Sequence, residues 1–227
     1  MVKFSATIEA LRKESEHLYN NTYAIVAHAI GFSRKDIQSD KSFKEILENK
    51  KWFSKNVDLD YLYQTRIKVL FEAIIDFSTK AQVYVNDKTK NHKIFTFKMA
   101  AKNLAETTKN LKIIQANIKK YSSSNEFLAL EYNKTRSNLG ELLRSIEELR
   151  VEDREKLYLI IKNLQKGKEI LKEIDTLTLS NVEYLISVRK ITTAEGISIL
   201  NDTTFAAKIA EELIGAVEVI FSKDISN

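Results

Sequence analysis

Residues 4–31, FSATIEALRKESEHLYNNTYAIVAHAIG, decide the fold class of this chain. Apolar and small side chains recur there at alternating steps of three and four residues, at Phe4, Ile8, Leu11, Ser15, Leu18, Thr22, Ile25 and Ala29. This spacing places them on one face of an α-helix, and such a face is stable only when other helices cover it. The stripe is followed by Gly31, which predicts the end of the helix.

The same periodicity continues through most of the 227 residues. A second run consists of Tyr63, Ile67, Leu70, Ile74, Phe77, Ala81 and Tyr84. The chain contains no proline and only five glycines, so few residues interrupt a helix. We therefore predict an all-α bundle of six long antiparallel helices, close to residues 4–31, 58–85, 90–121, 128–150, 157–190 and 194–221, with a short helix close to residues 42–50.

The predicted organisation is an elongated bundle of two consecutive three-helix units, at residues 1–121 and 126–227. The polar run Ser122–Asn125 is the clearest linker between them. Within the first unit, residues 32–57 form a basic, irregular connection in which Ser42 is placed to cap a short helix. One continuous domain is the alternative.

Composition narrows the class of protein. Lys and Arg outnumber Asp and Glu by 36 to 31, and the net charge of +5 permits weak attraction to phosphates or anionic lipids. The chain has no cysteine, which excludes disulfides and thiolate chemistry and is compatible with a reducing compartment. No stretch approaches the roughly 18–20 apolar residues that span a bilayer, and the first residues do not resemble a signal peptide. We therefore expect a soluble, cytoplasmic protein.

Three segments carry a resemblance to a known family. They are LYNNTYAIVAHAIGFSRKDI at residues 18–37, EYNKTR at residues 131–136, and KITTAEGISILNDTTFAAKIAEELIGAVEVIF at residues 190–221. Together they resemble the cytosolic C-terminal, PhoU-like region of bacterial sodium-phosphate cotransporter family proteins. The resemblance implies paired three-helix bundles that regulate phosphate uptake by contacting a membrane transporter, or its signalling partner, at the inner face of the plasma membrane. In some PhoU proteins acidic E/D-x-x-x-D motifs bind metal clusters.

Glu72 and Asp76 form the one Glu-x-x-x-Asp pair on a long predicted helix. Their spacing places two carboxylates on one helix face, as a divalent or ferric ion requires. Both nevertheless point away from the apolar stripe that contains Leu70 and Ile74, which favours a solvated acidic face. No cofactor is expected, and a metal-binding helical protein is kept as an alternative function.

Asp202 lies on the same helix face as Ile209 and Leu213, so its carboxylate is predicted to face the core. A buried carboxylate needs a partner, and Arg66 or Arg136 is the predicted one, through a bidentate contact. We interpret this pair as a structural staple that determines helix register, in preference to a ligand site.

One sector of the third long helix is basic, opposite Leu104, Leu111, Ile114 and Ile118; it consists of Lys98, Lys102, Lys109, Lys112, Lys119 and Lys120. An ordinary solvated helix face explains such a stripe, and the functional alternative is contact with anionic headgroups or an acidic partner. Nucleic acid is disfavoured, because the lysines lack interleaved exposed aromatic residues and arginines.

The sequence contains no glycine-rich phosphate loop and no Gly-x-Ser-x-Gly elbow, and its three histidines are far apart. These absences disfavour nucleotide-driven and hydrolase functions. Together with the resemblance, which implies docking on a membrane phosphate transporter, they make a regulatory, non-enzymatic role the leading interpretation. A self-assembling helical scaffold is a further alternative, because four-three spacing also builds homo-oligomeric coiled coils.

Overall fold

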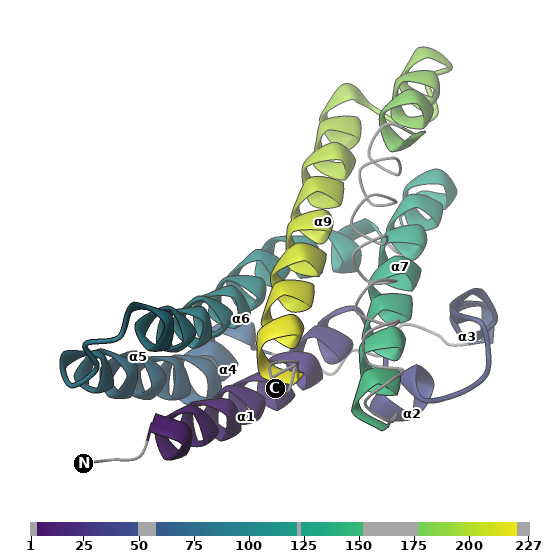
Figure 1. Ribbon diagram of the computed structural model, residues 1–227. Helices are drawn as coiled ribbons and strands as arrows, with labels where there is room; N and C mark the ends of the chain where they lie inside the picture. The colour runs from purple at the N-terminus through teal and green to yellow at the C-terminus, as the bar shows by residue number, and fades with distance from the viewer. Residues whose placement is uncertain (1–3, 50–57, 122–123, 152–176, 222–227) are drawn as a thin grey trace. The chain divides into compact units, whose positions relative to one another are not determined.

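The computed structural model describes residues 4–49, 58–121, 124–151 and 177–221, which form helices and no strand (Figure 1). This confirms the predicted all-α helical bundle. The elements are α1 (Phe4–Ala29), α2 (Arg34–Ile37), α3 (Phe43–Asn49), α4 (Leu59–Leu62), the π-helical turn η1 (Tyr63–Ile67), α5 (Lys68–Val83), α6 (Lys88–Tyr121), α7 (Glu126–Val151), the helical residues 177–187, and α9 (Thr193–Phe221).

Several helix ends lie where the sequence predicts them, because the capping residues act as expected. Gly31 adopts φ 83°, the left-handed conformation that terminates α1 at low cost. The Asp58 carboxylate accepts a 3.0 Å hydrogen bond from the Tyr61 amide at the start of α4. Thr192 and Glu195 cap each other at the start of α9, with the Thr192 amide 2.8 Å from the Glu195 carboxylate.

The predicted irregular connection at residues 32–57 contains α2 and α3 in its described part, so it is more ordered than expected. The short helix from Ser42 was predicted, but α2 was not. Ser33 and Asp36 form a reciprocal capping box, in which the Ser33 amide donates a 2.6 Å hydrogen bond to the Asp36 carboxylate. The pattern Ser-x-x-Asp was present in the sequence and is the signal that predicts this helix start.

The helix predicted from residue 58 contains the π-helical turn η1, and part of its predicted apolar stripe is not buried. A π turn accommodates an extra residue, so angles counted at ~100° per residue no longer hold across it. Ile67 and Ile74 are buried as predicted, whereas Phe77 and Tyr84 are exposed, which corrects the predicted stripe. Ser78 is buried in place of Phe77, and its hydroxyl donates a hydrogen bond to the Ile74 carbonyl.

The chain divides into two compact units, one from Met1–Ile25, Asp58–Lys109 and Glu212–Asn227, the other from Val26–Val57 and Asn110–Glu211. This division differs from a single boundary at residues 122–125, because α1, α6 and α9 each contribute to both units. These helices have 26, 34 and 29 residues. At about 1.5 Å per residue each is long enough to supply side chains to two cores. Most of the helix predicted at residues 157–190 lies outside the described residues.

The first unit contains the α5–α6 hairpin, whose two helices run side by side (Figure 1). The Lys98 ammonium on α6 donates a 2.6 Å hydrogen bond to the Gln82 side chain on α5. The Tyr19 ring on α1 meets the Phe221 ring on α9 edge to face, with ring centroids 5.4 Å apart. The apolar core of this unit includes Leu11, Leu18, Ile74, Ile94, Phe97 and Leu104.

In the second unit α2 and α3 pack against α7. The Phe43 ring of α3 lies on Gly140 of α7, where an added Cβ would come within 2.8 Å of the ring. The helical residues 177–187 approach α9 closely at Gly196 in a similar way. The buried core here includes Phe32, Ile37, Leu111, Leu128, Leu143, Ile146, Ile199 and Ile209. No helix in the described ranges is both long and apolar enough to cross a bilayer.

Candidate functional site

Asp202 is buried in the second unit, as the sequence predicts, with 2% of its surface exposed. Helix α9 places it on the same face as Ile199 and Ile209, because the three lie at helical spacing. Its Oδ2 atom accepts a 2.7 Å hydrogen bond from the Tyr132 hydroxyl on α7 and a 2.8 Å hydrogen bond from the Asn117 side-chain amide on α6. Its Oδ1 atom has no hydrogen-bond partner in the described part of the chain.

Burial dominates the electrostatics of this cluster. It raises the pKa of Asp202, against the opposing effect of the hydrogen bonds from Tyr132 and Asn117, which favour the carboxylate. Burial also raises the pKa of Tyr132, as does its hydrogen bond to Asp202, so the phenol stays protonated and acts as a donor. The Tyr121 ring stacks on the Tyr132 ring at 5.4 Å and 14°. The cluster therefore holds an acid by neutral donors in a packed core, which is the geometry of a structural staple.

The prediction that Arg66 or Arg136 pairs with Asp202 is wrong. Arg136 is buried, but its guanidinium donates 2.8 Å hydrogen bonds to the Ile30 carbonyl and to the Asn133 side chain, and it lies over the Phe32 ring. Burial lowers the pKa of Arg136 to about 10. Arg66, in the π-helical turn η1, is exposed. Helical angles counted along the sequence predict that Asp202 is buried. They do not indicate whether a neutral donor such as Tyr132 or a charged donor will pair with it.

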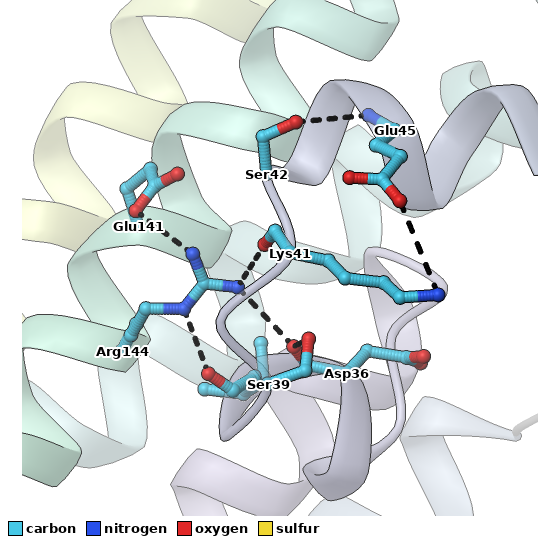
Figure 2. A network of polar contacts seen from close by, with 8 residues as sticks. Asp36, Ser39, Lys41, Ser42, Glu45, Glu141 and Arg144 are labelled. Atoms are coloured by element: carbon cyan, nitrogen blue, oxygen red, sulfur yellow. Dashed lines mark hydrogen bonds and ion pairs between the residues drawn. The ribbon is translucent and has the colours of Figure 1, made fainter.

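A second polar cluster, which the sequence analysis missed, anchors the α2–α3 segment to α7 (Figure 2). The Arg144 guanidinium donates hydrogen bonds of 2.9 Å to the Ile37 carbonyl, 3.3 Å to the Asp36 carbonyl and 2.9 Å to the Lys41 carbonyl. It also lies 4.1 Å from the centroid of the Phe43 ring. One planar cation thus satisfies carbonyls at the end of α2 and in the following loop, which a sequence pattern cannot indicate.

Glu147 extends this anchor by one helical turn along α7. Its Oε1 atom accepts a 2.6 Å hydrogen bond from the Arg34 guanidinium and a 3.0 Å hydrogen bond from the Gln38 amide. The side chain of Glu147 is only 11% exposed, whereas that of Arg34 is 62% exposed. The contact therefore secures both ends of the short helix α2 to α7.

Glu72 and Asp76 lie on the exposed face of α5, as the solvated reading expects. Their side chains are 63% and 62% exposed. The Lys68 ammonium lies 3.9 Å from Glu72, and the Lys80 ammonium lies 2.6 Å from Asp76. Among the described residues no group of three or more histidine or acidic side chains is placed to hold a metal ion. Glu72 and Asp76 therefore each form a surface ion pair with a lysine of their own helix.

The predicted lysine sector of α6 is opposite a buried face, because Leu104, Leu111, Ile114 and Ile118 are fully buried. Lys98, Lys102 and Lys109 belong to the first unit, and Lys112, Lys119 and Lys120 to the second. Lys109 lies 3.0 Å from Glu106, and this hydrogen bond raises the pKa of Lys109. The Lys120 ammonium lies over the Tyr121 ring, and their hydrogen bond raises the pKa of Lys120.

Apolar side chains are also exposed on α6, although residues 98–120, which contain the lysine sector, include no aromatic residue. Phe95 is 47% exposed and lies seven residues, close to two helical turns, before Lys102. Met99 and Ile113 are 38% and 44% exposed. The exposed side of α6 therefore combines lysines with apolar groups.

A shallow hollow of about 550 Å³ lies at the start of α9, bordered by Asn125, Ile186, Arg189, Lys190, Thr192 and Glu195. The Glu195 carboxylate is occupied by the capping box with Thr192. The Lys190 carbonyl accepts a 3.1 Å hydrogen bond from Asn125. These contacts stabilise the helix start and the preceding turn.

Comparison with known proteins identifies no family for this chain. No protein-family model matches it, and neither a curated protein nor a solved structure does. The resemblance carried by residues 18–37, 131–136 and 190–221 therefore stays a prediction.

Proposed function

We propose that this chain is a non-enzymatic, PhoU-like regulatory domain of phosphate transport, which docks on a sodium-phosphate cotransporter at the cytoplasmic face of the membrane. One observation carries the proposal. The three segments of the resemblance, far apart in sequence, are joined by buried hydrogen bonds in the second unit. Arg136 of the second segment binds the Ile30 carbonyl of the first, and Tyr132 of the second segment binds Asp202 of the third.

These contacts connect the residues of the resemblance with the packing of the helices. Buried polar groups must be paired, and pairing them specifies one register between helices. The motif residues that support the family assignment are thus residues that define how α7 packs on α9 and on the end of α1. A likeness at such positions supports a shared packing more strongly than a likeness at exposed positions does.

The exposed lysines of α6 supply the docking chemistry in this proposal. Lys102 and Lys109 are exposed in the first unit, whereas Leu104, on the opposite face of α6, is fully buried. Cations on an outward face attract acidic loops of a transporter and accelerate encounter, in a manner that salt weakens. Docking through this face is a recognition event that needs no catalytic group.

The test mixes the full chain with membrane vesicles that contain a sodium-phosphate cotransporter, with its cytoplasmic side outward, and with matched vesicles that lack it. We expect transporter-dependent co-sedimentation and a change in phosphate uptake. The double variant Lys102→Glu/Lys109→Glu should lose both effects. Lys13→Glu/Lys208→Glu makes the same change in net charge at exposed positions and should keep them.

Three outcomes contradict the proposal. Equal sedimentation with both kinds of vesicle would show that the transporter is not recognised. Equal losses in the two double variants would show that net charge alone decides binding. A mass that rises with concentration in light scattering would favour the self-assembling scaffold.

A further inference from the structure

The turn between α5 and α6 exposes two neighbouring apolar side chains. Val83 is 72% exposed and Tyr84 is 86% exposed, the two highest values among the large apolar and aromatic side chains of the described ranges. They end α5 and precede the first residue of α6 by only a few positions. Single exposed apolar side chains are ordinary, whereas adjoining ones rimmed by polar and charged groups are a feature of interaction surfaces.

Hydrogen bonds hold this turn in shape, so the exposure belongs to an ordered structure. The Tyr84 amide donates to the Ala81 carbonyl at 3.2 Å, and the Val85 amide donates to the Gln82 carbonyl at 3.3 Å. The Asn91 side-chain amide donates to the Val85 carbonyl, which ties the turn to the first helical turns of α6. A preorganised turn loses little conformational entropy when it binds.

Lysines flank the two apolar side chains in the sequence. Between residues 80 and 93 the chain has four lysines and one acidic residue. The acidic one, Asp87, caps α6 by accepting a 3.0 Å hydrogen bond from the Lys90 amide. Lys80 is 72% exposed although it pairs with Asp76, and Lys88 and Lys90 are exposed as well.

We propose that this hairpin tip, defined as Lys80, Val83, Tyr84, Lys88 and Lys90, contacts the anionic surface of a phospholipid bilayer. Tyr84 and Val83 enter the headgroup region, where amphipathic aromatic rings concentrate. The lysine side chains reach the lipid phosphates, and their attraction to an anionic surface adds to the apolar burial.

The composition of the tip favours lipid over a macromolecule. All four cations between residues 80 and 93 are lysines, which are depleted at protein interfaces, where arginine is enriched. Two apolar side chains also cover too little area for a stable protein interface. Single-stranded nucleic acid requires a groove with several stacking aromatic rings, whereas Tyr84 is the one aromatic residue of the tip. The lipid contact goes beyond the proposed function, since it requires no transporter.

The absence of native cysteine makes a direct test possible. A Tyr84→Cys chain is labelled with an environment-sensitive fluorophore and mixed with vesicles of phosphatidylcholine, with or without phosphatidylglycerol. We expect a blue-shifted, stronger emission only with phosphatidylglycerol, and weakening as salt rises. The matched Tyr184→Cys probe, at a position that is 62% exposed in the second unit, should not respond. A silent Tyr84 probe, or an equal response from the Tyr184 probe, overturns the proposal.

Unlabelled variants test the two components of binding by sedimentation with the same vesicles. Val83→Ser/Tyr84→Ser and Lys88→Glu/Lys90→Glu should each reduce binding to anionic vesicles about tenfold or more. A glutamate at position 88 suits a helix N-terminus, so the charge variant should stay folded, which circular dichroism checks. Lys44→Glu/Lys208→Glu, with the same charge change at exposed positions, should bind like the native chain.

Native binding by either tip variant, or an equal loss in the charge control, overturns the assignment. Because these vesicles contain no protein, a negative result here leaves docking on a transporter to its own test. Conversely, lipid binding by the tip in a chain that ignores the transporter would reject only the docking proposal.

Discussion

The Tyr132 hydroxyl on α7 donates a 2.7 Å hydrogen bond to Oδ2 of Asp202 on α9, across 70 residues of sequence. This contact gives a buried carboxylate a neutral donor, while its Oδ1 atom remains without a hydrogen-bond partner among the described residues. The two hydrogen bonds therefore offset only part of the desolvation free energy of the buried carboxylate. The loss of either one should make the native state less stable.

Removing this donor should destabilise the fold. Tyr132→Phe keeps the ring but leaves Asp202 with the Asn117 amide alone, and we expect the free energy of unfolding to fall by about 1–3 kcal/mol. Urea denaturation measures this loss. Tyr61→Phe, at a position 64% exposed, is the control and should change little. Equal stability of the two variants would contradict the staple.

The raised pKa of Asp202 predicts a pH dependence with a definite sign. The folded state binds a proton at Asp202 more tightly than the unfolded state, whose reference pKa is 3.8. Native stability, measured relative to Asp202→Asn, should therefore be highest below that value and fall as pH rises through the folded pKa. Urea denaturation of both proteins over a pH series gives the difference. A pH-independent difference would mean that Asp202 has its ordinary pKa in the folded state.

Sequence patterns predict most of the described helices of this protein because their signals are local. Gly31, Asp58 and Thr192 each act through backbone groups within four residues, so the sequence alone indicates what they cap. The burial of Asp202 follows in the same way from its spacing to Ile209. Such features need no knowledge of which helices become neighbours.

Long-range partners are harder to predict, because they depend on which helices meet. Arg144 donates hydrogen bonds to carbonyls more than a hundred residues away in the sequence. No sequence pattern distinguishes Arg144 from the other arginines for this role. Tyr132 takes the place expected of an arginine, since a neutral donor also satisfies a buried carboxylate. The error at Arg66 is of a different kind, since this side chain was placed on the apolar side of its helix and is exposed.

Gly140 should resist substitution because of a neighbour. An alanine usually stabilises a helix by about 1 kcal/mol relative to glycine. At position 140, however, the added Cβ would lie 2.8 Å from the Phe43 ring, so we expect Gly140→Ala to lower the melting temperature. Gly215→Ala, whose nearest contact is the Asn103 side chain at 3.3 Å, is the matched control and should be tolerated. Phe43→Leu should partly rescue Gly140→Ala.

The acidic pair on α5 should be dispensable for stability and for metal content. Glu72 and Asp76 are exposed and paired with lysines on their own helix. Glu72→Ala/Asp76→Ala should therefore cost less than about 1 kcal/mol in urea denaturation. Elemental analysis of native and variant protein, purified without chelator, should give the same metal content. Stoichiometric iron or zinc that disappears in the variant would instead support the metal-binding alternative.

Arg144 should control the local stability of the α2–α3 segment. Its guanidinium binds three main-chain carbonyls and stacks on Phe43, so Arg144→Ala should lower the free energy of unfolding by about 2–3 kcal/mol. Arg144→Lys should recover little, because an ammonium lacks the planar fork that reaches several carbonyls at once. Hydrogen exchange should accelerate at amides of residues 34–46 before it does so in α7. Arg66→Ala, at an exposed arginine, is the control. Full rescue by lysine, or uniform exchange throughout the second unit, would show that charge alone or global unfolding accounts for the loss.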